Sequence, residues 1–191
     1  MSKKQDIFDT TLRLITERGL HDTPMAMVAG EAQVAAGTIY HHFKNKEDLI
    51  LELYKNIKGK IHDAILIEEN SNSTYQRQFV QFWRSIYNYY IEKPEHFKFI
   101  EQFENSPYFQ KITQEDIIEF EEKFDRFLLI GIEDRHIKPL PTRLLTHLLL
   151  GSVAAVTKAR LKDQNEIDDS KVIKAIQVCW DGFKIKGLTN D

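Results

Sequence analysis

A short stretch of this sequence concentrates side chains that can donate hydrogen bonds and present aromatic planes: Thr38, Tyr40, His41 and His42. Ile39 and Phe43 lie four residues apart in the same stretch and would form one apolar edge of a helix. Such a helix would bury that edge and turn its polar side chains outward. Outward donors of this kind can meet phosphates and base edges, so the stretch indicates nucleic-acid binding.

The expected helix, residues 36–43, needs support, because isolated helices below about 12 residues are marginal in water. Thr23 and Pro24 predict the start of a second short helix over residues 24–32, with the threonine as cap and the proline in the first turn. Small residues in this helix would allow a close crossing: Ala26, Ala29, Gly30 and Ala32. Two short helices joined by a tight turn form a helix-turn-helix.

A long helix is expected to follow directly. Asn45 is a good N-cap, and Glu47 and Asp48 favour the positive end of the helix dipole. The apolar pattern continues to about residue 68. Lys46 stands at the same helix N-terminus, where backbone N–H groups and an ammonium could together hold a phosphate.

Residues 37–49 read Gly-Thr-Ile-Tyr-His-His-Phe-Lys-Asn-Lys-Glu-Asp-Leu, which resembles the signature of the TetR/AcrR family of bacterial transcriptional regulators. The similarity extends back through Val28, Ala29 and Thr23 to the first helix. It implies that Tyr40 and Lys46 grip phosphates while Thr38 and His41 approach bases in the major groove. The full set of expected DNA-contact residues is Thr23, Ala36, Gly37, Thr38, Tyr40, His41, His42 and Lys46.

Two positions depart from the family pattern. Gln33 stands where the turn usually has glycine, and Ala35 stands where serine or threonine usually caps the recognition helix. A non-glycine residue in a left-handed turn costs roughly 1–2 kcal/mol, and a lost cap costs roughly 1 kcal/mol. We therefore expect a motif of reduced stability.

The remaining sequence reads as helix throughout, which predicts an all-α protein of about nine helices. The first helix is expected over residues 3–18, ending at Gly19. We expect a three-helix DNA-binding domain over residues 1–48 and a helical effector-binding and dimerisation domain over residues 49–191. The helix over residues 46–68 would link the two.

The last two expected helices, residues 141–161 and 168–186, are more apolar than one buried face requires. The surplus suggests a partner helix from a second subunit, as the resemblance also implies. A buried helix of the monomer core is the alternative. The expected interface residues are Leu148, Ser152, Ala155, Val156, Ile176 and Trp180.

Aromatic residues are dense between positions 79 and 127. Aromatic residues at helical spacing more often fill the hydrophobic core, but they can also line a pocket for a small, largely apolar or aromatic effector. The candidate effector-binding residues are Trp83, Tyr87, Tyr90, Phe103 and Phe124.

Composition excludes several other classes. The single cysteine, Cys179, permits no intramolecular disulfide, and His62, His96, His136 and His147 lack metal-ligand spacing. We find no phosphate loop or nucleophile elbow, so we expect no enzyme, metal or cofactor. Neither a signal peptide nor a membrane span is expected, which favours the cytoplasm and no membrane partner.

The net charge of −3 divides into +1 for residues 1–60 and −4 for the remainder, so affinity for DNA should be modest and salt-sensitive. Together these features predict a repressor that binds a pseudo-palindromic operator in double-stranded DNA as a homodimer and is released by an unidentified effector. The alternative is a helical dimeric binding or scaffold protein that retains the motif without binding an operator.

Overall fold

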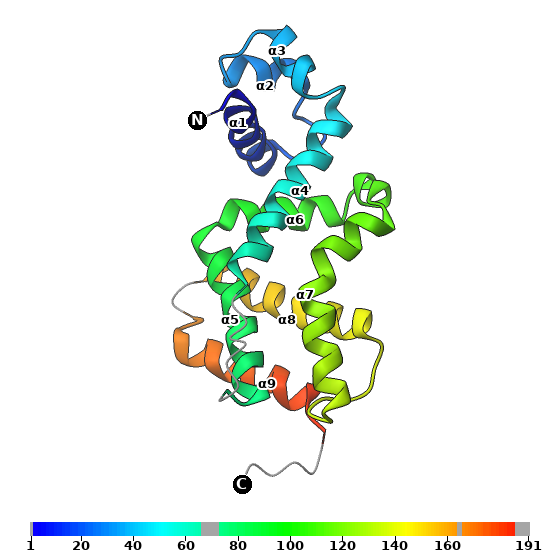
Figure 1. Ribbon diagram of the computed structural model, residues 1–191. Helices are drawn as coiled ribbons and strands as arrows, with labels where there is room; N and C mark the ends of the chain where they lie inside the picture. The colour runs from blue at the N-terminus through cyan, green and yellow to red at the C-terminus, as the bar shows by residue number, and fades with distance from the viewer. Residues whose placement is uncertain (1, 66–72, 164–165, 186–191) are drawn as a thin grey trace. The chain divides into compact units, whose positions relative to one another are not determined.

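The computed structural model describes residues 2–65, 73–163 and 166–185, and the side chains of residues 114–121 and 123 are outside the description. Within these ranges the chain forms nine α-helices, which Figure 1 labels, and one 3-10 helix. One β-bridge among the described residues joins Ile137 to Lys184. The predicted all-α class is confirmed. The elements are α1 (Lys3–Arg18), α2 (Met25–Glu31), α3 (Ala36–His42), α4 (Lys46–Ala64), α5 (Tyr75–Glu92), α6 (Pro94–Glu104), η1 (Pro107–Lys111), α7 (Gln114–Glu133), α8 (Thr142–Lys162) and α9 (Asp169–Phe183).

Backbone packing divides the chain into two compact units. The N-terminal unit comprises residues 1–60 and 93–117, and the C-terminal unit comprises residues 61–92 and 118–191. Helix α6 and η1 therefore pack with the helix-turn-helix, although they follow α5 in the chain. The expected domain boundary between residues 48 and 49 stays a prediction.

The N-terminal unit is built on α1. Ser2 caps this helix by accepting a hydrogen bond from the Gln5 N–H, and Gly19 ends it in a backbone conformation (φ 90°) that favours glycine. Its apolar face buries Ile7, Leu12 and Ile15. The predicted first helix is confirmed, and α2 and α6 pack against it.

The C-terminal unit has an aromatic interior in which α5 packs against α8 and α9. The Phe79 ring lies 5.2 Å from Trp180 and 5.3 Å from Phe183, measured between ring centroids. At the start of α5, Tyr75 stacks between Phe127 and His136 at 4.7 and 5.0 Å. This packing accounts for Tyr75, Phe79 and Phe127 among the aromatic residues of that part of the sequence.

Helices α9 and α4 were both expected to end later in the chain than they are described to. Helix α9 ends at Phe183 rather than at residue 186, because Lys184 is extended and pairs with Ile137. That part of the prediction was wrong. Helix α4 is described to Ala64, and its expected end near residue 68 lies outside the described residues.

Helix α8 is long and apolar enough to cross a bilayer by length and composition, which we had not expected of any described segment. Core helices of soluble proteins can pass the same test. Leu145, Leu149 and Val153 of α8 are buried, and the helix packs on α5 and α9. The remainder of its apolar surface belongs to an exposed face described below.

Candidate functional site

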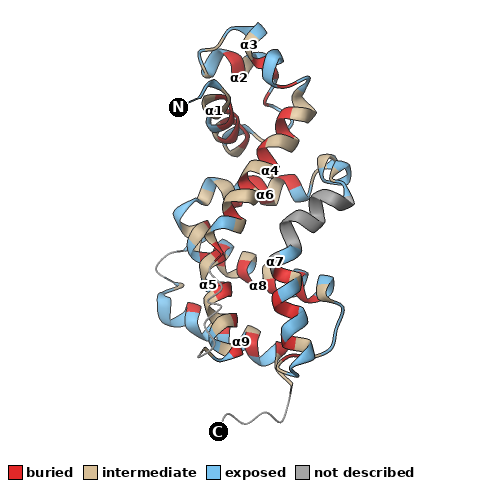
Figure 2. Cartoon of the chain, viewed as in Figure 1, coloured by how far each residue is buried: buried red, intermediate tan, exposed pale blue. Residues whose placement is uncertain are grey.

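Helix α3 has one buried apolar edge, and most of its other residues are exposed. Ile39 and Phe43 are almost completely buried, as predicted, and hold the helix in the N-terminal unit. Tyr40 is 56% exposed, and His41 and His42 beside it are also exposed. Much of the α3 ribbon is accordingly coloured as exposed in Figure 2. Of the polar and aromatic side chains singled out in the sequence, Tyr40, His41 and His42 are therefore accessible, and Thr38 is half-buried.

The first turn of α3 is open for close approach of its backbone. Ala36 and Gly37 are exposed, and Thr38 is half-buried. A Cβ atom placed on Gly37 would meet nothing within 4 Å. A double helix could therefore come near the α3 backbone here, while Tyr40 and His41 reach out one turn later.

The turn before α3 has the strained geometry expected for this sequence. Gln33 has φ 54°, in the left-handed region, and its N–H donates to the Gly30 carbonyl. Ala35 occupies the N-cap position of α3 and supplies no side-chain hydrogen bond. Both departures from the family pattern thus have the structural consequence that we predicted.

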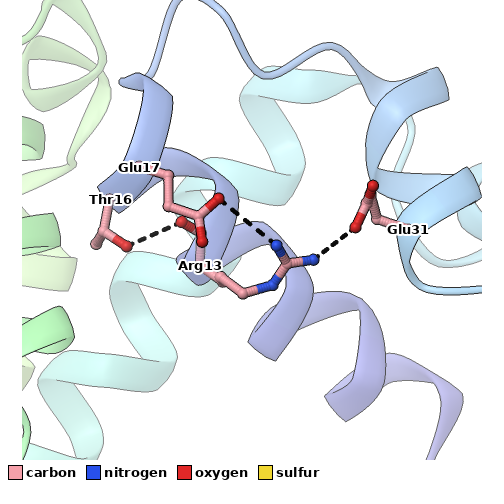
Figure 3. A network of polar contacts seen from close by, with 4 residues as sticks. All are labelled: Arg13, Thr16, Glu17 and Glu31. Carbon is pink, nitrogen blue, oxygen red and sulfur yellow. Dashed lines mark hydrogen bonds and ion pairs between the residues drawn. The ribbon is translucent and has the colours of Figure 1, made fainter.

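A charged contact fixes the end of α2 next to this turn. The guanidinium of Arg13 on α1 donates to Glu31 on α2 at 2.7 Å and lies 3.6 Å from Glu17 (Figure 3). The hydrogen bond to Glu31 raises the pKa of Arg13. Sequence reasoning missed this contact, because only the Arg13–Glu17 spacing is visible within one helix.

Lys46 lies at the start of α4, where predicted, but its side chain already has a partner. Its Nζ donates to the His21 carbonyl at 2.9 Å, and partial burial lowers its pKa. An ammonium carries three donors, so two stay available to a phosphate. Nearby, Asn45 caps α4 as predicted by accepting from the Asp48 N–H at 2.8 Å.

The expected role of Thr23 as a helix cap was wrong. Pro24 is the N-cap of α2, and no side chain caps this helix. Thr23 is buried, and its hydroxyl donates to the Gly19 carbonyl at 2.9 Å, which closes the loop between α1 and α2. In this conformation the hydroxyl faces inward and supports the loop that also receives Lys46.

This geometry agrees with two family descriptions. Residues 7–53 match bacterial regulatory proteins of the tetR family, and residues 74–184 match the tetracyclin repressor-like C-terminal domain. The chain belongs to the TetR family. Members of this family are transcriptional regulators rather than enzymes.

Among individual relatives, an uncharacterized HTH-type transcriptional regulator of Haemophilus influenzae is 32% identical over 110 residues, which are 58% of this chain and 59% of that protein. The fatty acid metabolism regulator protein of Bacillus subtilis is 41% identical over 58 residues, or 30% of each chain. The chain thus spans less than two thirds of these curated relatives.

Solved structures of the TetR family share the fold over nearly the whole chain. A protein of Shewanella sp. PV-4 assigned to the tetR family has a TM-score of 0.89 at 23% identity, covering 97% of this chain and 100% of its own. FadR from Bacillus subtilis, in complex with stearoyl-CoA, has a TM-score of 0.77 at 22% identity, covering 93% and 98%. At these identities the similarity concerns the fold.

The candidate effector residues of this TetR-family chain are all buried, and they divide between the two compact units. Trp83, Tyr87 and Tyr90 lie on α5, and Phe124 lies on α7. All four belong to the C-terminal unit. Phe103 belongs to the N-terminal unit, where it stacks on Tyr54 at 4.1 Å. Effector contact by these rings stays a prediction.

The candidate interface residues differ in how far they are exposed. Leu148 and Ala155 on α8 are exposed, whereas Ser152 and Val156 are half-buried. Ile176 and Trp180 on α9 are buried within the subunit, and Trp180 packs on Phe79 in the aromatic interior. Their part in a dimer interface stays a prediction.

The exposed apolar residues of α8 and α9 define what we call the α8–α9 face: Leu144, Leu148, Gly151, Ala155, Val178 and Gly182. Three of them are large hydrophobic residues that are between 46% and 73% exposed. A cavity of about 260 Å³ opens on this face, with Leu148, Ser152, Val178 and Cys179 in its wall. Nothing lies within 4 Å of a Cβ placed on Gly151 or Gly182.

Proposed function

We propose that this TetR-family protein is a cytoplasmic transcriptional repressor that binds a pseudo-palindromic operator as a homodimer and is released by a small apolar or aromatic effector. The observation that carries the DNA-binding part is the exposed face of α3. Tyr40, His41 and His42 are exposed at three consecutive positions of α3, while the buried Ile39 anchors the helix in its unit. A recognition helix held in this way can enter the major groove and read base edges.

The α8–α9 face supports dimerisation. Leu144, Leu148 and Val178 are large apolar residues with high exposure, and an exposed apolar patch of this kind marks an interaction surface. The small residues Gly151 and Gly182 would let helices of a second copy approach closely. In a two-fold dimer the α3 helices would contact half-sites about 34–36 Å apart, or a multiple of that.

A charge placed on this face tests the dimer. Ala155→Arg should give a monomer by light scattering, because an unpaired charge buried in a helix contact is costly. Ile173→Arg is the matched control: Ile173 is also exposed and apolar, but it lies five and nine residues before Val178 and Gly182, which is about 140–180° around α9. An unchanged dimer for Ala155→Arg would place the interface elsewhere.

The effector part rests on the aromatic interior of the C-terminal unit, in which Trp83 and Tyr87 stack at 5.5 Å. The solved FadR of Bacillus subtilis is in complex with stearoyl-CoA, a ligand with a long apolar chain. For release, the effector must favour the state that does not bind DNA, and a coupling of about 1–3 kcal/mol would change operator affinity roughly 5- to 150-fold.

Fluorescence anisotropy with DNA from upstream of the protein's own gene, over a salt titration, tests the repressor. We expect saturable binding that is displaced by this DNA more strongly than by a scrambled duplex. The slight +1 charge of residues 1–60, together with Gln33 and Ala35, favours the scaffold alternative. A folded dimer that fails to bind at low salt would support that alternative and exclude the repressor.

A further inference from the structure

The segment that leads from α2 into α3 has little apolar packing to hold it. None of residues 30–38, all of which are described, is buried, although Ala29 before them and Ile39 after them are. The other end of α3 is anchored better, because Phe43 is buried and its ring centroid lies 5.4 Å from that of Phe8 on α1. The N-terminal end of α3 therefore depends on the turn that precedes it.

This turn also has weak local support. Gln33 is in the left-handed region, and no side chain caps either α2 or α3. The Gln33 N–H donates to the Gly30 carbonyl at 3.1 Å. The Val34 N–H donates to the Ala29 carbonyl at 3.0 Å. Both acceptors belong to the last turn of α2, so the position of that helix end sets the position of the turn.

A side chain of α1 fixes this helix end. Nη2 of Arg13 donates to Glu31, the last residue of α2, at 2.7 Å, and Nη1 lies 3.6 Å from Glu17 on α1 itself (Figure 3). The side chains of residues 25–35 make no other hydrogen bond or ion pair with another described element. The Arg13–Glu31 contact is therefore the polar link between this segment and the rest of the described N-terminal unit.

The position of Glu31 is unfavourable unless Arg13 holds it. A carboxylate at the C-terminal end of a helix lies near the negative end of the helix dipole. Both side chains of the pair are between 43% and 50% exposed, and exposed ion pairs contribute little to global stability. The pair therefore matters less for folding than for the position of the helix end. Functional sites are where a broken local rule with a compensating contact is expected.

We propose that Arg13 and Glu31 are positioning residues for DNA recognition: their contact holds the end of α2 and, through the turn, the start of α3. The inference rests on the proposed operator binding. If the contact is broken, α3 occupies its DNA-binding position for a smaller fraction of the time, and the apparent operator affinity falls by that fraction. Phosphate contacts carry no sequence information, so binding to unrelated DNA depends much less on this position.

Amide hydrogen exchange of the DNA-free protein, resolved by residue, gives the first test. Arg13→Met and Glu31→Met each remove the contact and keep an unbranched side chain suited to a helix. The N–H groups of Gln33 and Val34 should exchange roughly two- to fivefold faster in both variants, because the pair no longer opposes local opening of the turn. The helix dipole alone predicts the opposite for Glu31→Met, since that change removes an unfavourable charge from α2.

Two controls accompany the exchange experiment. The Phe43 N–H, which donates to the Ile39 carbonyl at 2.9 Å, lies at the anchored end of α3 and should exchange as in wild type. Glu17→Gln removes the second carboxylate at Arg13 but leaves the contact with Glu31, so it should leave the turn unchanged. The proposal is overturned if neither turn amide exchanges faster, or if the Phe43 amide accelerates equally, which would mean a general loss of stability.

The second test compares operator and scrambled DNA by fluorescence anisotropy. Glu31→Met removes a negative charge, so charge alone predicts tighter binding to every duplex. The proposed contact predicts instead that Glu31→Met and Arg13→Met each lose roughly two- to fivefold in operator affinity relative to scrambled DNA, for each half-site. The double variant should lose no more than either single one, because the two residues act through one contact. An unchanged ratio for Glu31→Met would contradict the positioning role.

Failure of this inference and failure of operator binding give different results. A wild type that does not distinguish operator from scrambled DNA would overturn operator binding, and the role of the pair in recognition with it. Variants that bind operator as the wild type does would overturn the positioning role alone. The exchange experiment contains no DNA, so it decides in either case whether the pair holds the turn.

Discussion

The two compact units expose surfaces of opposite chemical character, one polar and one apolar. The N-terminal unit exposes hydrogen-bonding side chains such as Tyr40 and His41 above an apolar edge, which suits a hydrated, charged partner. The C-terminal unit exposes Leu148 and Val178 and buries two threonine hydroxyls that lack partners among the described residues. The first unit thus exposes polar groups of the kind that contact DNA, whereas the second exposes an apolar surface that we propose a second copy covers.

The largest effect is expected in the C-terminal unit at Gly131. A Cβ on Gly131 would lie 2.2 Å from the Tyr75 hydroxyl and 2.3 Å from its ring carbon Cζ. The ring cannot move aside easily, because it is stacked between Phe127 and His136. Gly131→Ala should therefore lower the free energy of unfolding by about 3 kcal/mol, measured by urea denaturation.

Gly59→Ala is the matched control, because nothing lies within 4 Å of a Cβ at this helical glycine. It should gain about 0.5–1 kcal/mol from helix propensity. Equal stabilities of the two variants would show that Tyr75 is not clamped as described.

The second-largest expected effect is a dependence of the free energy of unfolding on pH, caused by His96 in the N-terminal unit. His96 has its pKa lowered to about 4 by burial and by the charges of Lys60 and Lys93, with Asp9 opposing them. The unfolded chain, with a pKa near 6.5, binds the proton more readily than the folded chain. Stability from neutral His96 is therefore present above pH 6.5 and is lost as the pH falls from 6.5 towards 4.

Between pH 7 and pH 5 the wild type should lose up to about 2 kcal/mol for this reason, an upper limit because the ring is only half-buried. His96→Gln should remove most of that slope while leaving the contributions of other groups in place. Parallel pH profiles for the two proteins, from urea denaturation, would exclude His96 as the cause.

The helix-turn-helix could be predicted closely from sequence because its signals are local. The buried edge of Ile39 and Phe43, the Asn45 cap and the left-handed turn at Gln33 each depend on a few neighbouring residues. The Thr23 cap failed because a hydroxyl can also donate to a carbonyl four residues back. Sequence periodicity does not distinguish these two uses.

The C-terminal unit was predicted less well because its important contacts are between distant helices. Trp180 and Ile176 looked suitable for an interface, yet they fill the interior beside α5. Which apolar face of α9 is covered within the subunit depends on how α5 and α8 pack, and the α9 sequence alone does not contain that information. The same holds for the partner that Ser152 provides to Trp83.

The third prediction concerns DNA affinity. Lys46→Ala should weaken binding to operator and scrambled DNA alike, by about tenfold at low salt, and reduce the salt slope by about one. Lys46→Gln separates two roles of this side chain, because glutamine can still donate to the His21 carbonyl but carries no charge. If Lys46→Gln binds as wild type across the salt titration, the side chain acts by holding the loop and not by gripping a phosphate.

The smallest effects are expected where the helix-turn-helix departs from its family. Ala35→Ser would supply the missing N-cap of α3 and should stabilise the protein by about 1 kcal/mol. Gln33→Gly would relieve the positive φ of 54°, for a gain of roughly 1 kcal/mol that the flexibility of glycine in the unfolded chain partly offsets. Because α3 is short and exposed, either change should also tighten operator binding if turn rigidity limits it. Urea denaturation and anisotropy on the same variants distinguish the two effects: stabilisation with unchanged operator affinity would mean that the strained turn already holds α3 in its DNA-binding position.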